Sequence, residues 1–228
     1  MGALRHDRVR VITYPYEWTF SMLRDAALLQ LELAREALAE GVLTKDATSY
    51  NVQFNGARPV FIDLGSFERL VPGQPWPGYR QFCELFLNPL LLQSIAEIPF
   101  HPWLRGSING ISPTHAAAAL GKRKRLSKDL FTHVRLHARA ESRYADADKQ
   151  HDVRGELERA GFGPKIIDAQ MANLQKAVRR LEWRSAASTW SDYGDRSHYT
   201  DGDLDAKAEF VARPTGRAAL RGEARGRV

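Results

Sequence analysis

The feature that most constrains the fold is an Asn55-Gly56 pair between two short runs of β-forming residues. The runs are residues 51–54 (NVQF) and 59–63 (PVFID). An Asn-Gly pair readily takes the positive φ angles that a tight hairpin loop requires. Proline cannot donate to a strand ladder, so Pro59 belongs at the start of a strand or on an edge. The sequence therefore predicts one small antiparallel β-hairpin.

A long amphipathic helix is predicted immediately before the hairpin, over residues 19–40. Apolar side chains recur there at spacings of three and four, which gives one buried stripe: Leu23, Ala27, Leu31, Ala34 and Leu38. Thr19 or Ser21 can cap the first turn. Gly41 can end the helix, because glycine takes the left-handed conformation at little cost.

The rest of the chain has mostly helical patterns. Predicted helical segments are residues 79–98, kinked or split at Pro89, then 112–121, 127–150 and 168–188. Ser112 and Pro113 form a typical helix start. The predicted fold class is therefore α+β and mainly helical, with one small hairpin followed by a helical connector.

Three polar residues stand beside these apolar segments. Asp46 and Asn51 have the spacing D-x-x-x-x-N, and Asp63 follows the second hairpin strand and precedes Leu64-Gly65. A carboxylate can accept the proton of an attacking hydroxyl, while an amide oxygen and a second carboxylate are hard ligands suited to Mg²⁺. A hairpin would bring the second pair together at one end of a rigid element. The alternative is that Asp46 and Asn51 cap loops while Asp63 ends a strand.

The segments KDATSYN and FIDLG resemble the catalytic core of the protein-kinase and aminoglycoside-phosphotransferase superfamily. The resemblance implies a kinase C-lobe-like domain with Asp46 as catalytic base and with Asn51 and Asp63 holding Mg-ATP. The sequence departs from that pattern at Thr44-Lys45, where kinases carry His-Arg. We find no Gly-rich phosphate loop or β-lobe lysine before residue 19, so competent phosphotransfer by this chain is not expected.

Residues 14–38, 43–68 and 75–92 resemble the N-terminal region of a bacterial family of class I SAM-dependent methyltransferases that includes nodulation-type proteins. The resemblance implies further sequence at both ends, with a Rossmann-like domain afterwards. It also implies S-adenosylmethionine as cofactor and a small-molecule or glycan-type acceptor. Residues 160–168 (AGFGPKIID) follow a helix-like segment instead of a strand, so no cofactor-binding residue is assigned.

Three functions therefore remain open: a truncated methyltransferase-family member whose methyl-transfer domain is largely absent, a phosphotransferase, and a pseudokinase-like binding module without turnover. The expected domains are a C-lobe-like domain over residues 1–140, with the hairpin at about 50–64, and a helical connector over 141–190. An approach to the missing domain follows over 191–211. Residues 212–228, nearly all Arg, Ala and Gly, are predicted to be a disordered basic tail.

Composition and charge bear on four further features: nucleic-acid binding, membrane spans, disulfide bonds and metal binding. The net charge is +6, but the basic run at residues 121–128 lacks interleaved aromatic residues, so a nucleic-acid partner is not expected. The apolar stretches are too short to span a bilayer. Cys83 is the only cysteine, which excludes an internal disulfide and fits a cytoplasmic location. His133, His137 and Glu141 have a spacing that could hold a metal, but neighbouring arginines favour an ion-paired surface.

Overall fold

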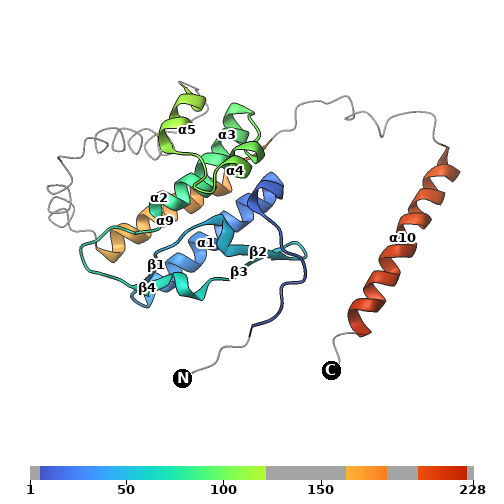
Figure 1. The fold of residues 1–228 in the computed structure, drawn as a ribbon, viewed down its shortest axis with the longest axis horizontal. Helices are drawn as coiled ribbons and strands as arrows, with labels where there is room; N and C mark the ends of the chain where they lie inside the picture. Colours follow the sequence, from blue (N-terminus) through green and yellow to red (C-terminus); the bar gives the residue numbers. More distant parts are fainter. Residues whose placement is uncertain (1–5, 122–162, 184–199, 225–228) are drawn as a thin grey trace. The chain divides into compact units, whose positions relative to one another are not determined.

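The computed structural model describes residues 6–121, 163–183 and 200–224, the last range with side chains as far as residue 213. Two compact units divide the chain, Met1–Arg184 and Ser185–Val228. Helices of the first unit are α1 (Phe20–Ala39), α2 (Tyr79–Phe82), α3 (Asn88–Ala96), α4 (His101–Gly106), α5 (Pro113–Leu120) and α9 (Pro164–Arg179). Its strands are β1 (Val42–Thr44), β2 (Val52–Asn55), β3 (Arg58–Phe61) and β4 (Phe67–Arg69). The prediction of a mainly helical α+β chain is confirmed (Figure 1).

Helix α1 forms where the apolar stripe predicts it. Thr19 is its N-cap, and the Thr19 side chain accepts a hydrogen bond from the Met22 N–H. Glu40 caps the other end, and Gly41 follows with φ +71°. Because that conformation is costly for residues with a Cβ, Gly41 explains why the helix stops here. All five predicted stripe residues are buried: Leu23, Ala27, Leu31, Ala34 and Leu38.

Strands β2 and β3 form the predicted hairpin. Asn55 pairs with Arg58, so the loop itself consists of Gly56 and Ala57. Gly56 has φ +62°, and a glycine at the first loop position is what a type II′ turn requires. Phe54 anchors the hairpin to the core through an edge-to-face contact with the Trp18 ring, with centroids 5.1 Å apart.

A second antiparallel pair, β1 with β4, was not predicted. Leu43 pairs with Glu68, and the two strands are three residues each. Strands this short contain too few residues to show an alternating pattern. Their pairing joins segments on either side of the hairpin and depends on tertiary contacts that sequence periodicity does not reveal.

The predicted helix over residues 79–98 contains a π-helical turn at Cys83–Leu87 between α2 and α3. The Asn88 N–H donates to the Cys83 carbonyl, five residues back, and Pro89 has no N–H to continue this pattern, so the carbonyl of Glu84 has no donor from the helix itself. The N–H of Ile111 donates to that carbonyl at 2.9 Å, and the Asn88 side chain donates to the Ile111 carbonyl at 2.8 Å. The irregular turn thereby holds the segment that leads into α5. The sequence correctly predicts an irregularity, but it begins six residues before Pro89.

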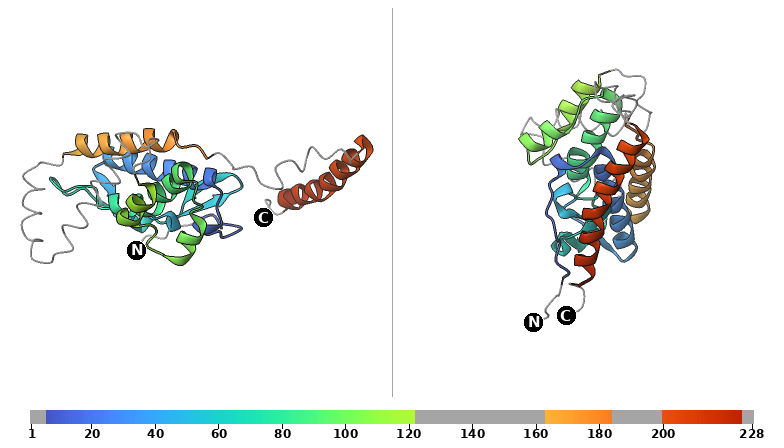
Figure 2. Two further views of the ribbon diagram at one scale, coloured as in Figure 1. Left: turned by 90° about the horizontal axis from the view of Figure 1, so that it is seen from above. Right: turned by 90° about the vertical axis from the view of Figure 1, so that its right-hand side faces the viewer.

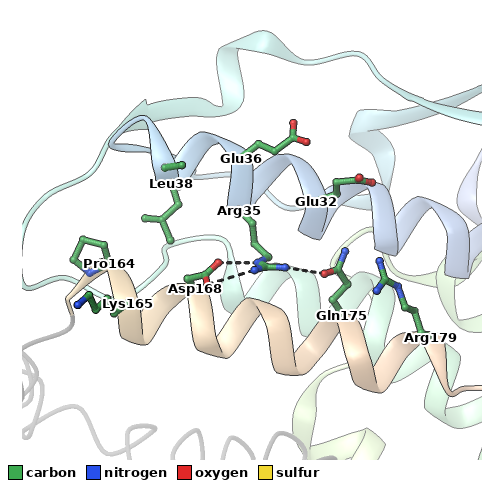
Figure 3. Close-up of a pocket in the computed structure, with 10 residues that line it drawn as sticks. Glu32, Arg35, Glu36, Leu38, Pro164, Lys165, Asp168, Gln175 and Arg179 are labelled. Carbon is green, nitrogen blue, oxygen red and sulfur yellow. Dashed lines mark hydrogen bonds and ion pairs between the residues drawn. The ribbon is translucent and has the colours of Figure 1, made fainter.

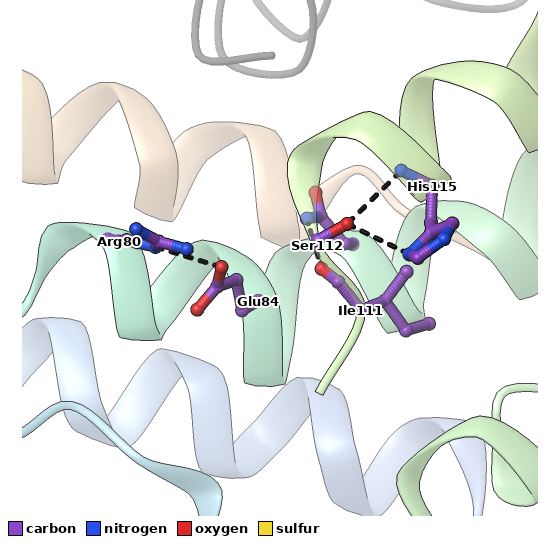
Figure 4. Close-up of polar contacts among 6 residues, drawn as sticks. Arg80, Glu84, Ile111, Ser112 and His115 are labelled. Carbon is purple, nitrogen blue, oxygen red and sulfur yellow. Dashed lines mark hydrogen bonds and ion pairs between the residues drawn. The ribbon is translucent and has the colours of Figure 1, made fainter. Parts of the chain in front are cut away.

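Polar side chains stabilise the same region (Figure 4). Arg80 forms an ion pair with Glu84 at 3.0 Å. Ser112 caps α5 as predicted, because its hydroxyl accepts from the His115 N–H at 3.3 Å and also contacts the His115 Nδ1 at 2.9 Å. The Ser112–His115 pair therefore has a structural explanation as a helix cap.

Helix α9 lies along α1 (Figure 1, Figure 2). It begins at Pro164, four residues earlier than predicted, with Gly163 as N-cap. Its buried face is apolar and belongs to the core of the first unit: Ile167, Met171, Leu174 and Val178. Segments far apart in the sequence thus form one hydrophobic core.

The second unit contains helix α10 (Asp201–Ala224). The prediction of a disordered tail from residue 212 differs from the structure, in which the helix runs through that position. All described side chains of α10, as far as residue 213, are exposed, including Leu204, Phe210 and Val211. The predicted helix at 127–150, most of the connector, and the group His133, His137 and Glu141 lie outside the described residues.

Candidate functional site

Asn51 and Asp63 are positioned at the open end of the hairpin. Asn51 is the last residue of a 3-10 turn, η2 (Ser49–Asn51), that leads directly into β2. Asp63 is the N-cap of a second such turn, η3 (Leu64–Ser66), that follows β3. The Ile62 N–H donates to the Asn51 carbonyl at 2.9 Å, which extends the hairpin ladder by one pair. The hairpin thereby brings the side chains of Asn51 and Asp63, which are twelve residues apart in the sequence, into contact.

Asn51, Asp63 and Ser66 form a closed hydrogen-bond network. The Ser66 hydroxyl donates to Asp63 Oδ2 at 2.6 Å, and the Asn51 Nδ2 amide donates to the Ser66 Oγ at 2.8 Å and to Asp63 Oδ2 at 3.3 Å. The Gly65 N–H donates to Asp63 Oδ1 at 3.0 Å. Both carboxylate oxygens of Asp63 therefore have donors from the chain itself.

Asp46 lies on the loop between β1 and η2, and its side chain is half-buried. No described hydrogen bond or ion pair joins it to Asn51 or Asp63. Its backbone neighbours are well fixed, however. The Lys45 N–H donates to the Ser66 carbonyl at 2.7 Å, and the Ala47 N–H donates to Gln81 Oε1 at 2.8 Å. The structure thus brings Asn51 and Asp63 into contact and holds the Asp46 loop against Ser66. The catalytic role of Asp46 stays a prediction.

The network turns the Asn51 nitrogen, and not the oxygen that Mg²⁺ prefers, toward Asp63. An ionised carboxylate can only accept hydrogen bonds, so its contact with Asn51 places the amide nitrogen on that side. A metal held by the Asn51 oxygen and the Asp63 carboxylate would have to displace these bonds. Within the ranges that the structure describes, no three His, Cys, Asp or Glu side chains gather into a metal-binding group. The metal-binding role of Asn51 and Asp63 stays a prediction.

Sequence reasoning missed the residues that support the site. Ser66 is fully buried and joins Asn51 to Asp63, and its only signal was its place directly after Asp63-Leu64-Gly65. Gln81 reaches the loop from α2, across 34 residues. Trp76 donates its indole N–H to the Thr44 carbonyl at 2.8 Å and so fixes the last residue of β1, directly before the loop. Neither of these two contacts has a sequence signal, because each joins distant segments.

A separate groove lies between α1 and α9 (Figure 3). It has a volume of about 810 Å³ and an open, charged lining. Arg35 crosses it, donating from Nε to Asp168 Oδ1 at 2.7 Å and from Nη1 to Gln175 Oε1 at 3.1 Å. The hydrogen bond to Asp168 raises the pKa of the Arg35 guanidinium above its usual value. This pairing joins the two helices, and the charge of Asp168 balances that of Arg35.

Cys83 lies in the π-helical turn and is fully buried. Burial raises the pKa of its thiol to about 12. Burial likewise raises the pKa of the neighbouring Tyr79 hydroxyl. A thiol that stays protonated at neutral pH is a poor nucleophile. None of the described helices is both long and apolar enough to span a membrane.

Comparison with known proteins gives one curated relative. The chain is similar to nodulation protein NoeA of Rhizobium meliloti (strain 1021), with 37% identity over 210 residues. The alignment covers 92% of this chain but only 44% of NoeA, so the chain spans less than half the length of this relative. No family model matches the chain. No solved structure matches it either.

Proposed function

We propose that this chain is the binding region of a NoeA-type protein that acts in nodulation, and that it does not itself carry out methyl transfer. The proposal assigns S-adenosylmethionine-dependent transfer to polypeptide outside the aligned region, with a small-molecule or glycan-type acceptor. The similarity to NoeA, which covers most of this chain and less than half of NoeA, supports this division.

The observation that carries the proposal is the closed network of Asn51, Asp63 and Ser66. A metal or substrate at Asp63 would share the carboxylate with these bonds, because Oδ2 accepts from Ser66 and Asn51 and Oδ1 accepts from the Gly65 N–H. Such a network stabilises the hairpin against the η3 turn, and it fits a pseudokinase-like module that binds without turnover.

The strand arrangement also supports the proposal. A Rossmann-like domain binds its cofactor at the carboxyl ends of parallel strands. In the described part of the chain, all strands lie in two antiparallel pairs, β1 with β4 and β2 with β3. These pairs provide no topological switch point, so this region is not expected to hold S-adenosylmethionine.

Phosphotransfer is the second candidate, and one contact favours it. Asn51 and Asp63 lie side by side at the end of the hairpin, as the resemblance to kinases implies. For this function, the Asn51 amide would have to turn its oxygen toward a metal and the Ser66 bond would have to open. The order of long helix, loop, hairpin and second loop is consistent with a kinase C-lobe-like arrangement.

Isothermal titration calorimetry separates these functions. The full chain is titrated with S-adenosylmethionine and with Mg-ATP, alongside the Asp63→Asn variant and the control Asp25→Asn, whose side chain is 45% exposed. We expect no heat from either ligand. Binding of Mg-ATP that Asp63→Asn abolishes and Asp25→Asn leaves unchanged would establish the phosphotransferase candidate instead. Binding of S-adenosylmethionine would contradict the assignment of methyl transfer to another region.

The part of the proposal that concerns the whole protein is tested on NoeA of Rhizobium meliloti. Full-length NoeA is titrated with S-adenosylmethionine under the same conditions, and we expect saturable binding. If NoeA and this chain both fail to bind S-adenosylmethionine, then the methyltransferase assignment is wrong. The proposed binding role of this region would then have to be tested independently of the methyltransferase assignment.

A further inference from the structure

Strand β3 has one edge that no other described strand pairs with. Among the described residues its only strand partner is β2, and the Asn55–Arg58 and Gln53–Val60 pairs set the hairpin register. In an antiparallel ladder, successive residues point their backbone groups alternately toward the partner and away from it. Ile62 donates inward, to Asn51. Pro59, Phe61 and Asp63 therefore direct backbone groups outward, and no described residue bonds to the N–H of Phe61 or Asp63.

Exposed apolar side chains accompany this edge. Val60, Ile62 and Leu64 alternate with more buried residues and are 41%, 46% and 54% exposed. On the opposite face, Phe61 packs its ring edge-to-face against Phe67 at 5.5 Å. An unpaired edge with an apolar row is a template for pairing with another strand. We call Arg58–Leu64 the β3 edge segment.

We propose that the β3 edge segment pairs with the same segment of a second copy of this chain. The two copies would be related by a two-fold axis at Phe61. Phe61 of each copy would donate to, and accept from, Phe61 of the other. The Asp63 N–H of each copy would donate to the Pro59 carbonyl of the other, which gives a four-stranded sheet joined by four new backbone hydrogen bonds.

Pro59 selects this register. Proline has no N–H, so the residue opposite it must not need a donor. In the proposed pairing, that residue is Asp63, and its carbonyl already accepts from the Ser66 N–H at 3.3 Å. A two-fold axis at Val60 would set Pro59 opposite Phe61 and leave the Phe61 carbonyl without a donor. The β3 edge segment is therefore complementary to itself in one register, which is why we choose a second copy as its partner.

The side chains agree with the same register. Val60 of one copy lies opposite Ile62 of the other, and the reverse pair is identical by symmetry. Directly opposed apolar pairs stabilise a sheet. The pairing also places Asp63 at the interface, so the two Asn51–Asp63–Ser66 networks lie at either end of the new strand pair. This proposal does not depend on the proposed function.

Analytical ultracentrifugation of the full chain tests the dimer across micromolar to submillimolar concentrations. We expect a reversible shift from the monomer mass of 25.7 kDa to twice that mass. The Ile62→Lys variant carries a lysine opposite Val60 in both apolar pairs of the dimer. Both pairs are therefore lost, and the dissociation constant should rise about tenfold or more. The control is Val71→Lys, because Val71 is similarly exposed, at 52%, outside the β3 edge segment. This control should dimerise like the wild type.

Amide hydrogen exchange is measured on the wild type alone, so this test remains valid even if a variant misfolds. The Ile62 amide bonds within the hairpin and should be protected at every concentration. The Phe61 amide should become protected only as the dimer forms. A chain that stays monomeric throughout the range contradicts the proposal. A dimer in which the Phe61 amide exchanges freely, or that Ile62→Lys leaves intact, contradicts it equally, because another surface would then join the copies.

Discussion

The Ser66 hydroxyl donates a 2.6 Å hydrogen bond to the Asp63 carboxylate, which makes a buried serine the link between the two sides of the hairpin base. We predict that Ser66→Ala lowers the free energy of unfolding by about 1–3 kcal/mol. The reason is that the buried bond to a charged group is lost and the Asn51 amide loses the nearer of its two acceptors. Urea unfolding followed by circular dichroism measures the change.

The control for this prediction is Ser21→Ala. Ser21 is exposed on α1, where alanine favours the helix, so this change should be neutral or slightly stabilising. If Ser66→Ala is as mild as Ser21→Ala, the network contributes nothing to stability. Its residues would then be held in place by the surrounding loops.

Gly110 is predicted to be intolerant of any side chain. It has φ +76°, and a Cβ there would overlap the carbonyl of Glu84 in the π-helical turn. Gly110→Ala therefore combines backbone strain with a steric clash and should destabilise the fold by about 2 kcal/mol or more. The thermal midpoint and the urea midpoint should both fall.

Gly106 offers a matched comparison, because it ends α4 without a positive φ and has open space where a Cβ would lie. We expect Gly106→Ala to change stability by no more than about 1 kcal/mol. Equal effects of the two substitutions would show that the contact between Gly110 and Glu84 does not constrain the fold.

Apolar packing, and not the ion pair, is predicted to hold α9 against α1. Leu174 is fully buried, so Leu174→Ala should cost about 2–5 kcal/mol. The Arg35 and Asp168 side chains are 36% and 45% exposed, and solvent screens their attraction. A double-mutant cycle with Arg35→Gln and Asp168→Asn should give a coupling of at most about 1 kcal/mol.

The exposed Ile166 on the same helix is the control for Leu174. Ile166→Ala should change the free energy of unfolding by less than about 1 kcal/mol. A coupling energy between Arg35 and Asp168 larger than the cost of Leu174→Ala would contradict the prediction, because the ion pair would then contribute more than the apolar packing.

Stability is predicted to fall at alkaline pH because of Cys83. The thiol of the unfolded chain titrates near its reference pKa of 9.0, while the buried thiol has a pKa of about 12. A raised folded pKa gives stability that is complete below pH 9 and is lost as pH rises toward 12. At pH 10 the loss should be about 1 kcal/mol relative to pH 7.

Urea unfolding of the wild type and of Cys83→Ala from pH 7 to pH 10.5 isolates this effect. The alanine variant is less stable at pH 7 because of the cavity, but the stability difference between the two proteins should narrow as pH rises. A constant difference across that range would mean that Cys83 ionises equally in the folded and unfolded chains.

Local signals in the sequence determined a large part of the first unit. Thr19 and Gly41 bound α1 because caps act within one turn of a helix. The hairpin followed from a turn and two adjacent runs, and it brings Asn51 to Asp63 because only the hairpin separates them. Ser112 and Pro113 likewise identified the start of α5.

Contacts between distant segments were decided by the tertiary structure. The pairing of β1 with β4, the hold of Gln81 on the Asp46 loop, and the packing of α9 on α1 all join residues whose proximity has no local pattern. The arrangement at the site differs from the expected metal site for the same reason. The sequence supplied an amide and a carboxylate suited to a metal, but the fold placed the buried Ser66 hydroxyl between them, and a hydrogen-bonded carboxylate offers fewer free oxygen lone pairs.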